Sequence, residues 1–211
     1  MTQRTRAGLS GFLAILLLAL PAGSQEPGEP KFHFDTGNPP WKGERIPLPP
    51  GFAPDLGWKG VEQIRFAPGM FQPDAPDFFS YIIVFLLEPD SAITKESIQK
   101  EHLVYYQGLA KAVMGSKGAS VDTSQFSMEL ESAEDLAPTP ESAEEPASYR
   151  GTLQWTEPFA TQKPQTLHFE ITTWTYEGKA VVLSCVSPVD PGKEMPWKTL
   201  REIRRSFRLS P

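Results

Sequence analysis

The residues best placed to do chemistry lie in the C-terminal part of the chain, at His168 and Glu170. They are two positions apart in a run that alternates apolar and polar residues, so a strand would carry both side chains on one face. A histidine and a carboxylate on one surface can act as a general acid–base pair, which suggests a hydrolase. Trp174 continues the same face, and Gln154 or Trp155 from a neighbouring strand could join it. The alternative, which we favour, is an ordinary polar face that is solvated or covered by a helix.

Other candidates for catalysis or metal binding are few. His33 lies in a polar N-terminal segment, and His102 lies on or beside the apolar stripe of a predicted helix, where a packed structural histidine is the simpler interpretation. Cys185 stands alone in an apolar run, which is typical of a buried inert thiol. His168 and Glu170 supply at most two metal ligands on one strand. We therefore predict no metal, no cofactor and no catalytic constellation.

Aromatic residues among prolines in the N-terminal half offer a second kind of site. Their rings could form a stacking platform for sugars or peptides, or they could pack loops onto the core. We favour packing for the five members of this group: Trp41, Phe52, Trp58, Phe66 and Phe71.

The first 24 residues have the pattern of a secretory signal peptide. Arg4 and Arg6 provide a basic start, residues 12–20 are an apolar run, and small residues follow Pro21. That run is short for a membrane-spanning helix, so we favour cleavage over retention as an anchor. The mature protein is then expected to be periplasmic or secreted, without a membrane span.

Charge and cysteine content restrict the classes of partner. The formal net charge is −6, and loss of Arg4 and Arg6 leaves 18 basic against 26 acidic residues, or about −8. An acidic protein is poorly suited to bind phosphate backbones, so nucleic acid is not an expected partner. A single cysteine forms no internal disulfide, so stability must come from an ordinary hydrophobic core.

Two uninterrupted apolar stretches define the centre of the predicted fold. Residues 78–87, rich in aromatic and β-branched side chains, and residues 180–186 are too short to span a bilayer and do not alternate. A strand with one face in water would alternate, so both faces of the sheet should be covered around these two strands. Further strands are predicted around residues 44–52, 61–66, 124–131, 148–157 and 165–175.

Two helices are available to cover the sheet. Residues 94–114 predict a long helix with Thr94 as its N-cap, and residues 196–207 predict a C-terminal helix that Pro196 opens. The sequence thus predicts an α+β fold, an α/β/α sandwich with a mostly antiparallel sheet of six to seven strands. Four arginines of the last helix are expected to face water or the helix C-terminus: Arg201, Arg204, Arg205 and Arg208.

The mature chain is predicted to form a single α/β domain over residues 44–211. Residues 25–43, rich in proline, glycine and charge, predict a flexible N-terminal extension that becomes ordered near Trp41. Residues 132–147 combine prolines with acidic residues and predict a disordered acidic loop. A calcium site in that loop is the less favoured alternative, because the acidic residues lack the tight spacing of calcium ligands.

The order of predicted elements resembles the PsbP and Mog1 group of α/β/α sandwich domains. The likeness rests on Ile46-Pro-Leu-Pro-Pro-Gly-Phe52, a strand–long helix–strand unit, and a late hairpin followed by a closing helix that ends in Ile203-Arg-Arg-Ser-Phe207. It covers residues 44–208, and the acidic loop at 132–147 departs from the pattern. The resemblance implies a small non-catalytic domain that binds protein partners, and it brings no catalytic residue with it.

These observations favour an exported non-enzymatic domain that binds a protein or envelope partner. A hydrolase that uses His168 and Glu170 is one alternative. A carrier that holds a small apolar ligand between the helices and the sheet is another. Trp155 and Trp174 are the candidate binding residues.

Overall fold

The structure, a computed structural model, describes residues 30–89, 91–136 and 144–211. Within these residues the main sheet has seven strands: β2 (Lys42–Leu48), β3 (Gly60–Phe66), β4 (Tyr81–Leu87), β5 (Ser127–Ser132), β6 (Glu144–Thr156), β7 (Pro164–Tyr176) and β8 (Lys179–Ser187). A second sheet pairs β1 (Lys31–His33) with β9 (Arg208–Ser210). The helices are α1 (Lys95–Ser116) and α2 (Trp197–Ser206), with a short 3-10 helix, η1, at Thr123–Gln125.

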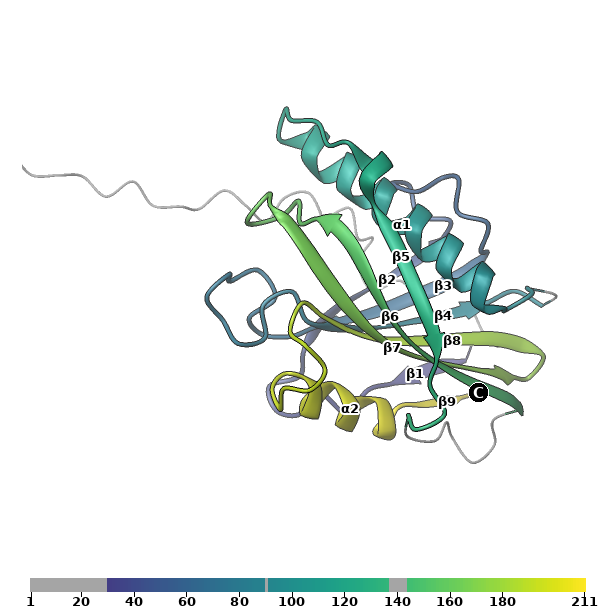
Figure 1. Cartoon of the computed structure of the whole chain (residues 1–211). Helices are drawn as coiled ribbons and strands as arrows, with labels where there is room; N and C mark the ends of the chain where they lie inside the picture. The colour runs from purple at the N-terminus through teal and green to yellow at the C-terminus, as the bar shows by residue number, and fades with distance from the viewer. Residues whose placement is uncertain (1–29, 90, 137–143) are drawn as a thin grey trace, which may run out of the picture.

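The main sheet is antiparallel throughout, in the order β2-β3-β4-β8-β7-β6-β5, and the two α-helices lie on opposite faces of it (Figure 1). Each helix covers its own hydrophobic cluster. The predicted α+β fold, a sandwich around an antiparallel sheet of up to seven strands, is confirmed. The helices predicted at 94–114 and 196–207 match α1 and α2 to within two residues at each end.

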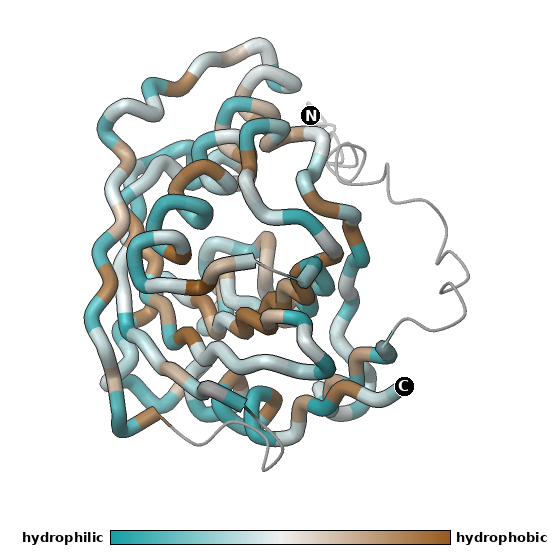
Figure 2. Tube along the Cα trace, turned by 90° about the vertical axis from the view of Figure 1, so that its right-hand side faces the viewer, coloured by the Kyte–Doolittle hydropathy of each residue, from teal (hydrophilic) through white to brown (hydrophobic). Residues whose placement is uncertain are grey.

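β4 is buried along its whole length at the centre of the sheet. Its odd-numbered residues join the cluster under α1, and its even-numbered residues join the cluster under α2. No position faces water, which explains why this stretch is apolar without alternation. In Figure 2 the hydrophobic segments accordingly gather inside the molecule. The predicted strand at 78–87 starts three residues too early, because Phe79 has a positive φ of 49° that turns the chain before Tyr81.

α1 begins where the sequence predicts. The Thr94 hydroxyl accepts the backbone N–H of Ser97, and the Ser97 hydroxyl accepts the backbone N–H of Thr94. This capping box gives both N–H groups a hydrogen-bond partner. The N–H of Ser97 lies in the first helical turn, where no carbonyl of the helix is available to accept from it. One flank of α1 packs against the loop before β3, where Gly108 approaches the Phe52 carbonyl, and the other flank lies beside β5 and η1.

The segment before β2 is more ordered than the sequence predicts. The flexible extension expected at 25–43 is wrong for residues 31–33, which form β1 against β9, and for residues 42–43, which belong to β2. The reason is hydrophobic: Phe32 and Phe34 pack on Phe207, directly after α2, with ring centroids 6.2 and 5.0 Å away. Residues 1–29, which include the predicted signal peptide, lie outside the described residues.

The predicted acidic loop at 132–147 is also partly structured. Ser132 ends β5, and residues 144–147 belong to β6. Between them, Ala133 and Leu136 are buried, and Asp135 accepts two hydrogen bonds from the Arg150 guanidinium at 2.6 and 2.9 Å. The few apolar residues of this segment therefore dock onto the sheet. Residues 137–143 lie outside the described residues.

Gly108 gives a direct test of how α1 is seated. A Cβ at this position would lie within 3 Å of the Phe52 carbonyl oxygen and of Ala53. Gly108→Ala should therefore lower the free energy of unfolding by about 1–2 kcal/mol, although alanine is the better helix former. Gly115, on the same helix, has open space where its Cβ would lie, so Gly115→Ala should raise the free energy of unfolding by about 0.5–1 kcal/mol. Urea unfolding of both variants measures the difference. Equal effects would contradict the close packing of α1 at Gly108 against Phe52 and Ala53.

Candidate functional site

The structure places the predicted acid–base pair on one face, as expected, but separates it from Trp155. His168, Glu170 and Trp174 alternate along β7 with residues of the cluster under α1, so they lie on the α2 side of the sheet. Trp155 on β6 belongs to the cluster under α1, on the opposite face. The idea that Trp155 joins His168 and Glu170 is therefore wrong, because the β6–β7 register pairs Trp155 with Gln165 rather than with a residue of that face.

Glu170 is fully buried and binds two arginines from α2. Arg201 Nη2 donates to Oε1 at 2.6 Å, and Arg204 Nη1 donates to Oε2 at 2.8 Å. Burial opposes ionisation of Glu170, but the hydrogen bonds and charges of the two arginines outweigh it and hold the pKa below its ordinary value. Arg201 and Arg204 were expected to face water; they turn inward instead because a buried carboxylate requires counter-charge. Glu170 thus acts as an anchor for α2.

His102 also belongs to the core. Its Nδ1 donates to the Ile98 carbonyl at 2.8 Å, which leaves Nε2 to accept from the Ser184 hydroxyl at 3.3 Å. A serine bonded to a histidine is the pairing of a nucleophile with its base, but Ser184 has no exposed surface and His102 is 2% exposed. Burial lowers the pKa of His102 to about 4, so the ring is neutral. The structural role favoured from the sequence agrees with this geometry.

Cys185 lies on the α2 side of β8 and is completely buried. Its thiol donates to the Leu200 carbonyl at 3.5 Å, and burial raises the pKa of the thiol to about 12. The thiolate is the reactive form of cysteine, so this residue is poorly suited to act as a nucleophile.

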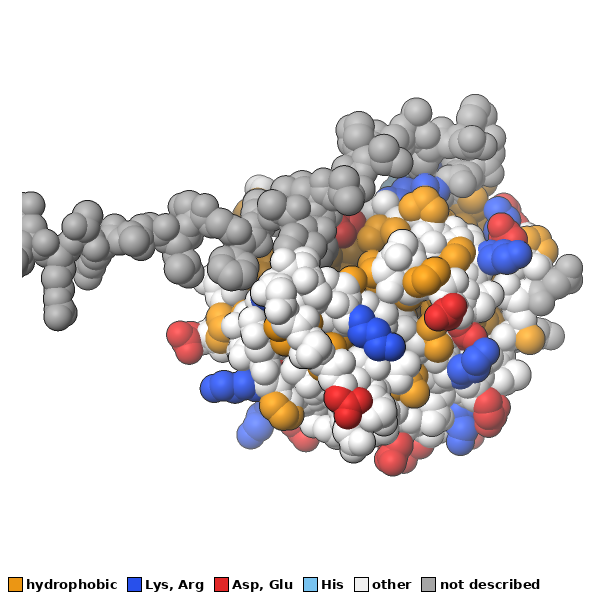
Figure 3. Space-filling model, turned by 90° about the horizontal axis from the view of Figure 1, so that it is seen from above, with side chains coloured by type: hydrophobic (Ala, Val, Ile, Leu, Met, Phe, Trp, Pro, Cys, Tyr) orange, Lys and Arg blue, Asp and Glu red, His pale blue; other side chains and the backbone are white. Residues whose placement is uncertain are grey.

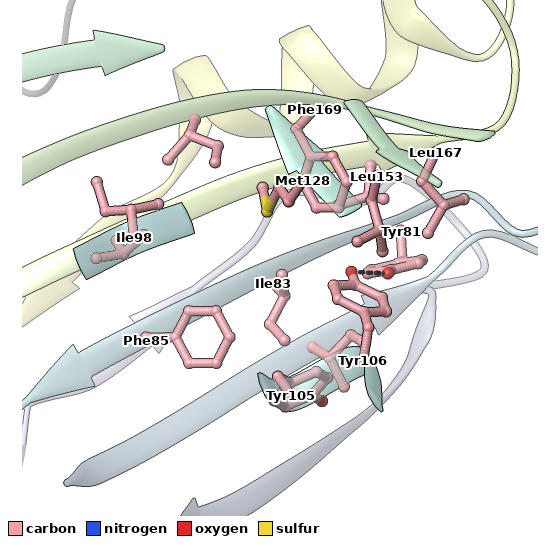
Figure 4. Close-up of a cluster of buried hydrophobic side chains, with 14 of the residues drawn as sticks. Tyr81, Ile83, Phe85, Ile98, Tyr105, Tyr106, Met128, Leu153, Leu167 and Phe169 are labelled. Carbon is pink, nitrogen blue, oxygen red and sulfur yellow. Dashed lines mark hydrogen bonds between the residues drawn. The ribbon is translucent and has the colours of Figure 1, made fainter. Parts of the chain in front are cut away.

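A polar cluster that the sequence analysis missed lies under α1. The Tyr105 hydroxyl donates to Glu62 Oε1 at 3.0 Å, and the hydroxyl groups of Tyr81 and Tyr106 share a hydrogen bond, drawn in Figure 4. Burial raises the pKa of Glu62 to about 8. The imperfect alternation of residues 61–66 was the available signal, because it places a glutamate on a face that is otherwise apolar.

Clefts open at the surface of the described residues, among them two that lie beside α1 and β1. One of about 430 Å³ lies beside the first turn of α1 and is lined by Gly57, Trp58 and Glu101 among others. The second, about 260 Å³, lies near β1 and is lined by Phe32, Arg45 and residues of β3 and β4. Neither is lined by the sequence-predicted candidates His168, Glu170, Trp155 or Trp174.

Both large hydrophobic side chains that are exposed in the described residues stand on loops at one end of the sheet, which we call the loop end. It comprises residues 67–80 between β3 and β4, residues 157–163 between β6 and β7, and residues 188–196 before α2, on the left of Figure 1. The exposed large hydrophobic residues of the described chain, Phe71 at 43% and Met195 at 48%, both lie there. Phe71 is therefore exposed, whereas the other four aromatic residues predicted to pack are buried or half-buried.

The aromatic side chains of the loop end support one another. The Phe71 ring lies 5.7 Å from that of Phe159 and 6.2 Å from that of Phe66, between centroids, and Phe159 in turn contacts the buried Phe79 at 5.7 Å. Phe66 and Phe159 are half-buried. The exposed ring of Phe71 is thus the outer member of an aromatic row that continues into the core.

The loops of the loop end are fixed by internal hydrogen bonds. The fully buried carboxylate of Glu157 accepts from the backbone N–H groups of the next loop residues, Phe159, Ala160 and Thr161. Asp77 accepts from the backbone N–H of Gly69 at 3.0 Å, which closes the β3–β4 loop. These contacts hold the loops in one conformation, so Phe71 projects from a rigid support.

Surface charge is mixed on the face seen from above. In Figure 3, acidic and basic side chains are interspersed among hydrophobic ones on that face. Of the described helices, neither α1 nor α2 combines the length and the apolar character that crossing a bilayer requires.

No family model matches the sequence, and no curated protein is similar to it in sequence. Among solved structures, the chain is similar to LpqN of Mycobacterium tuberculosis, which is involved in cell envelope biogenesis. The two share 11% sequence identity over 89% of this chain and 88% of that chain, with a TM-score of 0.36. A likeness of that size carries no argument about function. The resemblance to the PsbP and Mog1 group is not confirmed by these comparisons.

Glu170→Gln tests the anchoring role of the buried carboxylate. The variant should lose about 3–5 kcal/mol of unfolding free energy at pH 7, because Arg201 and Arg204 lose their counter-charge in the interior. The stability that a lowered pKa contributes is present above the ordinary glutamate value of 4.5 and is lost as pH falls through the folded-state value. The difference from the wild type should therefore shrink below pH 4.5, as measured by urea unfolding at several pH values.

The matched control is Glu194→Gln. Glu194 pairs with Lys198 at 3.7 Å on the same helix region, but its side chain is 79% exposed, so stability should stay near that of the wild type. If Glu170→Gln is as stable as the wild type at pH 7, the anchoring role of Glu170 is contradicted.

Proposed function

We propose that this chain is an exported, non-enzymatic domain that binds a protein partner through its loop end. The proposal is carried by one observation: both exposed large hydrophobic side chains of the described residues, Phe71 and Met195, stand on loops at the same end of the sheet. Large hydrophobic side chains exposed on loops at one end of a sheet are candidate contacts for a protein partner. Loops on a rigid scaffold are also where binding residues concentrate.

The rigidity of the loop end favours binding. Association costs conformational entropy when flexible loops must become ordered, and loops that are already fixed avoid most of that cost. The Glu157 carboxylate and the Asp77 side chain hold the loops that carry Phe159 and Phe71. An aromatic ring supported in this way has the properties of an interface anchor, which fills a pocket on the partner and excludes water.

Export is supported by the basic and apolar pattern of residues 1–24. The acidic charge expected after removal of that segment favours a protein partner over a nucleic acid. The hydrolase alternative is weakened because Glu170 is fully buried and both of its carboxylate oxygens accept hydrogen bonds from Arg201 and Arg204. The clefts beside α1 and β1 open at the surface and lend the carrier alternative no support.

Site-specific photo-crosslinking in the native host tests the proposal. A photoreactive phenylalanine analogue at position 71 should form an adduct with an envelope or secreted protein. The analogue at position 195 should form an adduct with the same protein. The analogue at position 176, at the opposite end of β7, is the matched control and should not form that adduct.

The identified partner then allows a quantitative test. Phe71→Ser should weaken its binding to the purified domain by about 30-fold, the effect of losing an interface anchor worth 2 kcal/mol. Tyr176→Ser should leave the dissociation constant unchanged. Binding of a protein through the loop end would be refuted by equal adducts from positions 71 and 176, or by adducts with glycan alone. It would also be refuted if Phe71→Ser bound the partner with wild-type affinity.

A further inference from the structure

The interior under α1 contains a carboxyl group that the binding surface does not account for. Glu62 on β3 has no exposed surface. The Tyr105 hydroxyl donates to its Oε1 at 3.0 Å, whereas its Oε2 has no hydrogen-bond partner. An ionised carboxylate in this position is strongly unfavourable, because burial removes the hydration of the charge and one oxygen receives no compensating contact.

Glu44 on the edge strand β2 is the carboxyl group closest to Glu62 in the sheet pairing. Glu44 lies opposite Ile64 and Glu62 lies opposite Ile46, so the two glutamates are diagonal neighbours on one face, within reach of long side chains. Ile64 belongs to the cluster under α1, so this is the face that α1 covers. Glu44 is half-buried and therefore connects the pair to solvent.

The groups around the pair supply hydroxyls and negative charge. Among the described residues, those that interact electrostatically with Glu62 are Glu44 from β2, Tyr81 from β4, and Tyr105 and Tyr106 from α1. Burial raises the pKa of Glu62 to about 8 against the hydrogen bond from Tyr105, and the charge of Glu44 adds to the rise. Burial likewise raises the pKa of Glu44 to about 7. A proton is thus the species that neutralises the pair.

We propose that Glu44 and Glu62 form a proton-binding pair that holds the edge strand β2 beneath α1 and releases it as the solution becomes alkaline. A proton on Oε2 neutralises Glu62 in the interior, where the Glu44 carboxyl is its diagonal neighbour across the register. Loss of that proton places two negative charges side by side under the helix. β2 is the element that yields, because it is the outermost strand of the main sheet, with β3 as its neighbour.

The direction of the pH dependence follows from the two raised pKa values. Stability contributed by a carboxyl group with a raised folded-state pKa is complete below its ordinary value of 4.5 and is lost as pH rises through the folded-state value. The window of loss therefore runs through about pH 7 for Glu44 and about pH 8 for Glu62. Between 4.5 and these folded-state values, each pH unit raises the opening equilibrium constant about tenfold per group, and above pH 8 the loss is complete.

Carbon-13 NMR of the glutamate side-chain carboxyls in the purified chain tests the pair directly. Two resonances should titrate together between about pH 6 and 9, as coupled sites do. In Glu62→Gln the Glu44 resonance should titrate in a single step with a midpoint above 4.5, because burial, the cause of its raised pKa, remains. In Glu44→Gln the Glu62 midpoint should fall but stay above 4.5, because burial remains.

Hydrogen exchange of the β2 amides tests the release of the strand. After correction for intrinsic exchange, their protection factors in the wild type should fall by about tenfold per pH unit for Glu62 between about pH 4.5 and pH 8, and then level off. In Glu62→Gln the fall should be less steep and end near pH 7, because Glu44 remains. Glu129→Gln, an exposed change on β5 at the opposite edge, is the control and should behave as the wild type. The β5 amides serve as an internal control.

Three outcomes would overturn the proposal. One is a Glu62 carboxyl that titrates near 4.5. Another is an unchanged pH dependence of β2 protection in Glu62→Gln or, if that variant does not fold, in Glu44→Gln. The third is a shift of both resonances on addition of calcium chloride or of a chelator at constant pH, because a metal ion rather than a proton would then occupy the pair.

Discussion

Complete burial of β4 on both faces is the constraint on which the rest of the structure depends. A strand that is apolar on both sides cannot lie at the surface of a half-solvated sheet, so the chain must supply cover above and below it. α1 covers one face, and α2 covers the other with β8 beside β4. Phe207, directly after α2, packs on Phe32 and Phe34 and so links the pair β1 and β9 to the cluster under α2. β1 and β9 meet there because Phe32 and Leu209 pack against one hydrophobic cluster.

The polar groups enclosed by this arrangement differ in the hydrogen-bond and charged partners that they have. Glu170 receives two arginines, and His102 is bonded at both ring nitrogens, so each has a defined protonation state. Glu62 has a single hydroxyl partner and therefore depends on a proton. Glu170 thus joins β7 to α2, and His102 joins α1 to β8, whereas the loop end is where we propose that a partner binds.

The sequence predicts those parts of the fold that depend on local pattern. The apolar run of β4 indicates its burial, and Thr94 marks the start of α1, because both signals come from adjacent residues. Long-range partners escape prediction. Nothing near Glu170 indicates that Arg201 and Arg204 reach it, and Phe32 finds its place only because Phe207 lies at the other end of the chain. The face of Trp155 depends on the β6–β7 register, which the turn between the strands sets.

Native-state hydrogen exchange tests most directly whether β4 is enclosed from both sides. If α1 and α2 shelter it, the β4 amides should be among the slowest to exchange, with an opening free energy equal to that of global unfolding. The amides of the edge strand β5 should open at a lower free energy. Exchange of the β4 amides as fast as that of β5 would contradict the enclosure, and with it the assignment of the buried polar groups to structural roles.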